Sequence, residues 1–469
     1  MDDNIIRLQS LELKNIKNVS TGRIVMPNTY GKRHCYETAE VLGIYGQNGS
    51  GKTAVIDALY FLQNIMIGRS LKEELSDYID AKESQAEISA EFAISMDHVI
   101  YEVCYKVQIQ RVKKSAEILR EVLSCARNTR EKRSNKIVFM DYRREEDNPV
   151  FTPRKRLDEL IEQDRENKTD LIVARKIAEK SRCSYIFGEN SREIFFRDYE
   201  NAFHEYSVII KRLFRYALTD LFVIRNSHSG VISANFVLPM AFRIDKDNQC
   251  NAGIKGDFAI SLAEPTILDE ERRKVLGQIV EQINMVLCTI IPGMKLDIQD
   301  YGLQLMDSGK EGYKAELLSV REGMPPIPIR MESEGIIKII SILNALIQAF
   351  GNASICLAID ELDSGIFEYM LGELLDIFNK SAKGQLIFTS HNLRALEMLG
   401  KESIMFSTAN PDNRYIHMKN IKNTNNLRDV YLRSITLGGQ NEVLYSETDS
   451  LKIARTFRKA GRSIRDGKK

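Results

Sequence analysis

A phosphate-binding loop is the strongest chemical signal in this chain. The pattern G-x-x-x-x-G-K-[ST] is met by Gly46, Gln47, Asn48, Gly49, Ser50, Gly51, Lys52 and Thr53. Glycines let backbone N–H groups close around phosphates, and the N-terminus of the helix that follows adds a favourable dipole. Lys52 is expected to reach the β and γ phosphates, and the Thr53 hydroxyl to bind Mg²⁺. These residues therefore predict a site for a nucleoside triphosphate and magnesium.

Two adjacent carboxylates far downstream form the second signal. The apolar segment 354–359 has the character of a buried strand, and it ends in Asp360 and Glu361. Next to a phosphate loop, Asp360 would hold Mg²⁺ directly or through water, and Glu361 would act as the general base for an attacking water. The pair could instead only cap the next helix, but a phosphate loop in the same chain favours the catalytic role.

A histidine at the end of the next apolar strand is the third signal. Residues 385–390 repeat the layout of an apolar strand with a polar end, and His391 follows. A lone histidine is more often structural than functional. Its place at the end of this strand nevertheless predicts a contact with the γ phosphate or the attacking water.

The order of these motifs resembles that of ABC-type ATPases of the RecF, SMC and OLD class. The resemblance implies hydrolysis of ATP, with Mg²⁺, where two copies of the chain meet. It also implies a signature segment from the opposing copy, which matches Ser333, Glu334 and Gly335 here. Glu334 stands where the usual L-S-G-G-Q sequence has glycine. Residues 437–440 are closer to that consensus, but they follow His391 and are expected to form a turn.

The elements that must position these residues can be predicted from the hydrophobic pattern. We expect an opening strand at 5–16 with a bulge near Gln9, a central strand at 41–45, and antiparallel strands at 86–94 and 100–107. A helix at 270–289 should end before Pro292. The resemblance implies an α/β fold of the ABC-type P-loop ATPase kind, with a mixed central sheet, flanking helices and an antiparallel β flank.

Four regions follow from changes of composition along the chain. Residues 1–112 and 226–426 would form the two parts of the ATPase lobe, 113–225 a mainly helical insertion, and 427–469 a C-terminal extension. The insertion mixes basic and acidic residues, which is typical of a solvated helical surface rather than a nucleic-acid groove. Its aromatic residues are spaced like a buried helical stripe, with base stacking as the alternative. These are Phe195, Phe196, Tyr199, Phe203, Tyr206, Phe214 and Tyr216.

Composition limits the classes of partner. The chain has 469 residues, with 66 Lys plus Arg against 65 Asp plus Glu, so no global charge attracts nucleic acid or an anionic membrane. The seven cysteines include no C-x-x-C pair, which argues against a zinc site and favours a reducing compartment. We find neither a signal peptide nor an apolar run of about 20 residues, and therefore expect a soluble, cytoplasmic protein without a membrane partner.

Two functions beyond ATP hydrolysis remain open at this point. The chain looks most similar to the stand-alone ATPases of prokaryotic abortive-infection and anti-phage systems. That resemblance implies a homodimer or higher homo-oligomer that senses or scaffolds and controls a separately encoded effector such as a nuclease. The alternative is a DNA-repair or DNA-end-binding ATPase that clamps nucleic acid through its insertion. The basic segment 455–469 is read as a solvated tail, or else as a contact for a partner or nucleic acid.

Overall fold

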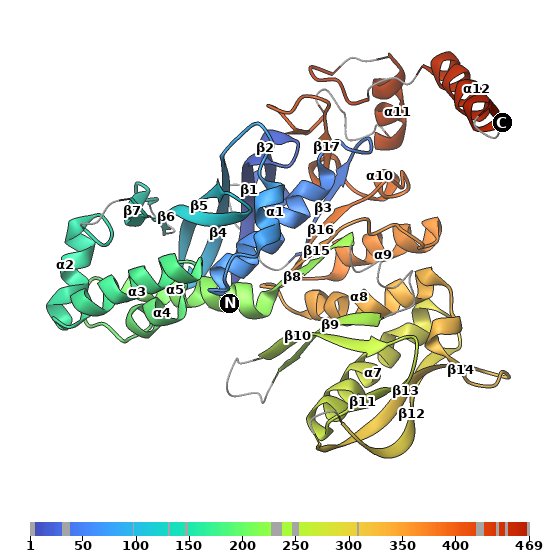
Figure 1. The fold of residues 1–469 in the computed structure, drawn as a ribbon, viewed down its shortest axis with the longest axis horizontal. Helices are drawn as coiled ribbons and strands as arrows, with labels where there is room; N and C mark the ends of the chain where they lie inside the picture. The colour runs from blue at the N-terminus through green and yellow to red at the C-terminus, as the bar shows by residue number, and fades with distance from the viewer. Residues whose placement is uncertain are drawn as a thin grey trace.

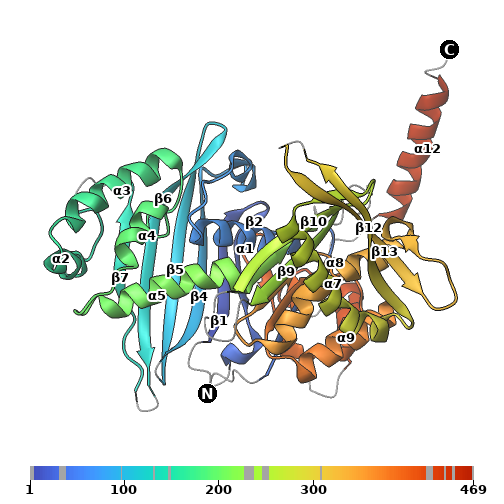
Figure 2. The same cartoon turned by 90° about the horizontal axis from the view of Figure 1, so that it is seen from below.

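A computed structural model describes residues 5–30, 38–96, 98–129, 132–145, 149–226, 237–245, 253–306, 309–418, 426–437, 440–445 and 449–466. Figure 1 shows a central body with a β-rich and helical region on one side and a second β-rich region on the other. The helix α12 (Ser450–Asp466) extends away from the body in both views (Figures 1 and 2).

The central sheet has six strands in the order β18-β17-β3-β16-β15-β8. These are β18 (Tyr415–Ile416), β17 (Ile404–Ser407), β3 (Glu40–Tyr45), β16 (Gln385–Thr389), β15 (Cys356–Ile359) and β8 (Leu221–Ile224). All neighbours pair in parallel except β17 and β18, so the sheet is mixed, as predicted. Because parallel strands end at the same edge, the residues that follow β3, β15 and β16 are brought together.

Alternate residues of the central strands enter two different cores. Leu42 and Ala358 belong to a core with the phosphate-loop helix α1 (Lys52–Met66). Val41 and Leu357 belong to a core with α9 (Glu368–Ser381) and α10 (Ala395–Met398). Burial on both faces explains why these strands are almost continuously apolar in the sequence.

An antiparallel sheet packs over α1 as the predicted β flank. Its order is β2-β1-β4-β5-β6-β7. The first four strands are β2 (Val19–Val25), β1 (Ile6–Ile16), β4 (Gln85–Met96) and β5 (Val99–Val112). The register between β1 and β4 shifts between Leu8 and Ser10, so the predicted bulge is confirmed. Two 3₁₀ turns, Pro27–Tyr30 and Glu73–Tyr78, lie on the connections around this sheet.

The expected helical insertion begins later than predicted. Residues 113–143 were expected to be mainly helical, but β6 (Ser115–Asn128) and β7 (Ile137–Arg143) extend the antiparallel sheet beyond β5. The helices follow as α2 (Arg154–Gln163), α3 (Asn167–Ser181), α4 (Glu189–Phe195) and α5 (His204–Arg215), and a short π-helical segment (Tyr216–Asp220) leads into β8. Most of the predicted aromatic stripe is buried among them, including Phe195, Tyr199, Phe203 and Tyr206.

The second β-rich region lies between β8 and β15 in the chain. It contains the hairpin of β9 (Val237–Asp245) with β10 (Gly253–Ser261), and a sheet of order β11-β13-β12 in which β14 also pairs with β13. These strands are β11 (Thr266–Leu268), β13 (Glu311–Arg321), β12 (Met294–Leu305) and β14 (Ile327–Pro328). The predicted helix is α7 (Glu270–Ile290), which begins at the Asp269 cap and packs in a third core with α8 (Glu334–Gly351).

Helix α8 is the one helix among the described residues that is long and apolar enough to cross a membrane. By length and composition alone it passes that test, but 61% of the window is buried inside the fold. Its side chains enter the core under α9 and the core shared with α7. Its apolar character is therefore that of a core helix.

The C-terminal segment includes two helices. Helix α11 (Leu427–Leu437) packs against the central body through Leu427 and Tyr431, whereas residues 450–461 of α12, whose burial the structure describes, are almost all exposed. The basic segment that the sequence favoured as a solvated tail is thus helical through Asp466. Gly438 and Gly439, which belong to the signature-like sequence at 437–440, lie outside the described residues.

Candidate functional site

The phosphate loop lies between β3 and α1, as its sequence predicts. Lys52 begins α1 and is only 6% exposed, and its Nζ donates to the carbonyl oxygens of Gly46 at 2.9 Å and Gln47 at 3.0 Å. Burial lowers the pKa of Lys52 and outweighs the attraction of the nearby carboxylates. The Lys52 ammonium is therefore held at the phosphate loop by two backbone carbonyl oxygens.

Glycine at position 46 is required by close packing. A Cβ on Gly46 would lie 2.0 Å from the Ser407 Oγ, and its φ of +153° is one that L side chains rarely adopt. The loop is also held from outside, because Tyr415 donates to the Gly51 carbonyl at 2.6 Å and Asn18 donates to the Gly49 carbonyl. Its shape is thus fixed by β17, β18 and the β1–β2 turn.

Asp360 meets Thr53 at the carboxyl edge of the central sheet. The Thr53 hydroxyl donates to Asp360 Oδ1 at 3.2 Å, and the Thr389 hydroxyl donates to the same oxygen at 2.7 Å. Asp360 is 2% exposed, and its Oδ2 has no hydrogen-bond partner among the residues that the structure describes. A buried carboxylate oxygen without a partner is costly unless a cation completes it. A hydroxyl and a carboxylate oxygen are ligands that Mg²⁺ prefers, so these residues fit the predicted metal.

Glu361 adopts a backbone conformation that is uncommon for its residue type. Its φ is +49°, in the left-handed region, at a cost of about 1–2 kcal/mol. Two hydrogen bonds hold this conformation. The Glu361 N–H donates to the Thr389 hydroxyl at 2.7 Å, and the Nζ of Lys338 on α8 donates to the Glu361 carbonyl. The strained turn at Glu361 directly follows Asp360, so Glu361 leaves the direction of strand β15.

His391 follows β16 and lies next to the loop after Glu361. Its backbone N–H donates to Asp363 Oδ2 at 3.0 Å. Partial desolvation and the nearby Lys52 ammonium lower the pKa of His391, although three carboxylates oppose them. The imidazole is therefore neutral at neutral pH and can accept or donate a hydrogen bond.

The signature segment begins α8 at the predicted position. Ser333 is the N-cap residue and is exposed, but its side chain makes no capping hydrogen bond, which differs from the capping role its type suggests. Gly335 packs on the loop after Glu361: a Cβ there would lie 1.9 Å from the Gly365 carbonyl oxygen. A role for Ser333, Glu334 and Gly335 in the site of a second copy remains a prediction.

Three residues near the site were missed by sequence reasoning. Thr389 and Lys338 bind Asp360 or Glu361 as described above, and Arg225 donates to Asp57 of α1 at 2.9 Å. Only Thr389 had a signal, because it is a polar residue at the end of an apolar strand. Arg225 directly follows β8, the strand beside Asp360, and residues 227–236 lie outside the described part of the chain.

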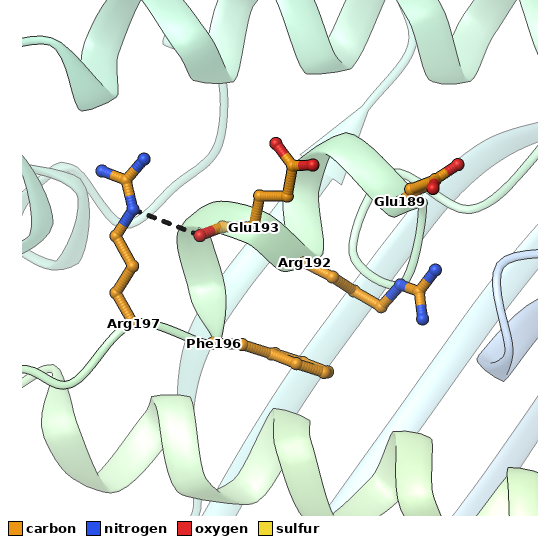
Figure 3. Close-up of a pocket in the computed structure, with 5 residues that line it drawn as sticks. All are labelled: Glu189, Arg192, Glu193, Phe196 and Arg197. Carbon is orange, nitrogen blue, oxygen red and sulfur yellow. Dashed lines mark hydrogen bonds between the residues drawn. The ribbon is translucent and has the colours of Figure 1, made fainter.

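A separate hollow lies on the helical insertion. Its volume is about 390 Å³ and it is lined by Glu189, Arg192, Glu193, Phe196 and Arg197 (Figure 3). The Arg192 guanidinium lies 4.3 Å from the centre of the Phe214 ring, and Arg197 pairs with Asp164 at 3.1 Å. Charges of both signs line it and none of the predicted site residues does, so we assign it no ligand.

Comparisons with known proteins agree with this description. Residues 41–206 match the family described as "AAA domain, putative AbiEii toxin, Type IV TA system". No curated protein matches the sequence.

Among solved structures, the chain is similar to SMC head domains. The Smc head domain from Pyrococcus furiosus, solved with an extended coiled coil and bound to the C-terminal domain of ScpA, has 13% identity and a TM-score of 0.39. The match covers 88% of this chain and 96% of that chain. The SMC head domain from Thermotoga maritima has 12% identity and a TM-score of 0.34, with 88% and 99% covered.

Proposed function

We infer that the protein binds ATP with Mg²⁺ and hydrolyses it. Residues 41–206 match a family described as an AAA domain, which supports this inference. The convergence of Thr53, Thr389 and Asp360 carries this inference, because it leaves one buried carboxylate oxygen without a partner beside the phosphate loop. When bound there, Mg²⁺ would neutralise charge on the β and γ phosphates.

Each site residue then has a role in hydrolysis. Lys52 and the loop N–H groups bind the phosphates, and Thr53 and Asp360 hold the metal. Glu361 accepts a proton from the attacking water. At the same time the water oxygen bonds to the γ phosphorus, and the bond from that phosphorus to the bridging oxygen, which leaves with ADP, breaks. The neutral His391 orients the water or donates to the γ phosphate.

We further propose that two copies pair through ATP and that this pairing controls a separately encoded effector in anti-phage defence. Exposure of Ser333 and Glu334 at the N-terminus of α8 supports the first part, since such a terminus favours a phosphate from another molecule. The matched family's description, "putative AbiEii toxin, Type IV TA system", supports the role in defence.

Two substitutions test the hydrolysis. Glu361→Gln should reduce steady-state ATP turnover at least about a hundredfold while ATP still binds, because the base is lost but the phosphate contacts remain. Lys52→Ala should lose ATP binding itself. ATP binding by calorimetry and phosphate release separate the two results. Unchanged turnover in either variant would refute the assignment.

Pairing has its own test. Light scattering of Glu361→Gln with ATP and Mg²⁺ should show a mass twice that of the monomer, and removal of Mg²⁺ should reverse it. Adding Ser333→Arg should keep the mass at that of the monomer, because the long arginine side chain would fill the space between Ser333 and the second copy. A paired Ser333→Arg variant would contradict the role of the signature segment.

A further inference from the structure

Helix α12 presents an apolar and basic surface to solvent. Ile453 and Phe457 lie one turn apart and are 43% and 74% exposed, and Leu451 is 70% exposed. The same helix carries four cations and no acid between Ser450 and Gly461, namely Lys452, Arg455, Arg458 and Lys459, all exposed. An exposed apolar face of this kind is expected to be covered in the working protein.

Helix α9 presents the complementary surface on the body. Tyr369 and Ile377, on one face, are 60% and 53% exposed, and Phe367 at the start of the helix is 67% exposed. Between them stand Glu373 and Asp376, with Glu368 beside Phe367. Lys380 is the one cation of this helix and is paired with Asp376 at 2.7 Å. The side chains of α9 itself are therefore apolar and net acidic, and Arg394, which pairs with Glu397, lies 4.9 Å from the centre of the Tyr369 ring.

We propose that α12 of one copy docks on α9 of a second copy of this chain. The two helices are similar in length, about 26 Å for the 17 residues of α12 and about 21 Å for the 14 residues of α9. Phe457 and Ile453 pack against Tyr369 and Ile377, and the cations of α12 lie beside Glu368 and Glu373. This contact goes beyond the proposed ATP-driven pairing and does not depend on it.

The charges and the position of α12 favour α9 of a second copy as its partner. Two α12 helices would bring six basic residues against six, with Asp466 as the one acid on each, so self-pairing is disfavoured, whereas α9 offers opposite charge. Both views in Figures 1 and 2 show α12 leading away from its own body, where a second molecule can reach it. A narrow apolar stripe that includes the small Ala454 suits close approach to a helix better than insertion into a lipid surface.

Disulfide trapping between two variants, each with one added cysteine, tests the contact. Phe457→Cys and Ile377→Cys, carried on chains with tags of different size, are mixed and oxidised without nucleotide. The expected result is a cross-linked heterodimer on a non-reducing gel. Val173→Cys, on α3 and 48% exposed, replaces Ile377→Cys in the matched control and should give none. No cross-link above the control, or a cross-link formed only within one chain carrying both cysteines, overturns the proposal.

Charge reversal gives an independent test. Arg455→Glu with Arg458→Glu should reduce the yield of the cross-link about tenfold, and Glu368→Arg with Glu373→Arg on the other copy should restore it. Failure of the second pair to restore the yield overturns the contact. The experiment is repeated with Lys52→Ala, in which ATP-driven pairing is absent, so loss of the proposed ATPase function leaves the expected cross-link unchanged.

Discussion

Lys338 connects helix α8 to the turn at Glu361. Its side chain is 6% exposed, and its Nζ donates to the Glu361 carbonyl, near Asp360 and Asp363. Burial outweighs the attraction of these carboxylates and lowers the pKa of Lys338 to about 8. A cation kept in such a place holds Glu361 in its left-handed conformation.

We expect Lys338→Met to impair catalysis more than binding. Without the donor, the carbonyl of Glu361 loses its partner and the carboxylate moves from its position, so kcat should fall about ten- to a hundredfold. KM for ATP should change by less than about threefold, because the phosphate contacts are untouched. Lys338→Arg keeps a donor and should recover part of kcat. Equal loss of kcat in both variants, with unfolding at the assay temperature, would point to a structural role only.

The same lysine predicts a pH dependence of stability. Its pKa is about 8 in the folded protein and 10.5 when exposed, so the unfolded chain binds the proton more tightly. Stability should therefore rise with pH between about 8 and 10.5, by roughly 3 kcal/mol at most from this group. Chemical denaturation at pH 7.5 and 9.5 should show the free energy of unfolding rising more in the parent protein than in Lys338→Met. The same rise in both proteins would contradict the shifted pKa.

At the scale of elements, the packing of α8 on the loop after Glu361 depends on Gly335. An added Cβ would lie 1.9 Å from a backbone oxygen of Gly365, which no side-chain movement can relieve. Gly335→Ala should thus cost about 1–3 kcal/mol of stability and displace the signature segment. ATP turnover should fall at least about tenfold while ATP binding to the monomer persists.

Gly351→Ala is the matched control for this helix. It is the last residue of α8, and a Cβ there would meet nothing within 4 Å. Its stability and turnover should equal those of the parent protein within experimental error. If Gly335→Ala behaved like Gly351→Ala in both measurements, the contact between α8 and the loop at Gly365 would contribute neither to stability nor to ATP turnover.

The sequence predicted the elements whose signals are local. The phosphate loop, the buried strands before Asp360 and His391, and the bulge near Gln9 follow from residue type and period, and the structure confirms their positions. Residues 113–143 were misread because their charged side chains cover the outer face of a sheet. Strands β6 and β7 bury alternate residues such as Leu123 and Phe139 against helices far away in the chain.

Contacts between distant segments could not be predicted from the sequence. Lys338 stands in the middle of an apolar helix, where nothing in the sequence indicates that its ammonium meets a carbonyl after β15. The pairing of Arg225 with Asp57 likewise depends on β8 lying beside β15, which only the order of strands reveals. The meeting of Thr53 with Asp360 was thus predictable, whereas the residues that hold the turn at Glu361 were not.

At the scale of the whole molecule, the charges of the insertion argue against a nucleic-acid groove. Many of its cations are bound to carboxylates within the fold, and bound cations neutralise few phosphates. The pairs include Arg120 with Asp141, Arg143 with Asp141, Lys136 with Glu91, Arg156 with Glu159, Arg175 with Glu179 and Arg197 with Asp164. In α12, by contrast, residues 450–461 carry four exposed cations and no acid.

Measuring the binding of duplex DNA across a salt series tests this distribution of charges. With the six basic residues of α12 as the main phosphate contacts, the slope of log K against log salt should be no steeper than about −5. Binding should be equal with and without ATP, and Arg455→Glu with Arg458→Glu should roughly halve the slope. A steeper slope that requires ATP and survives this double substitution would mean that the ATPase body itself clamps DNA. The function would then be that of a DNA-repair or end-binding ATPase rather than of a controller of a separate effector.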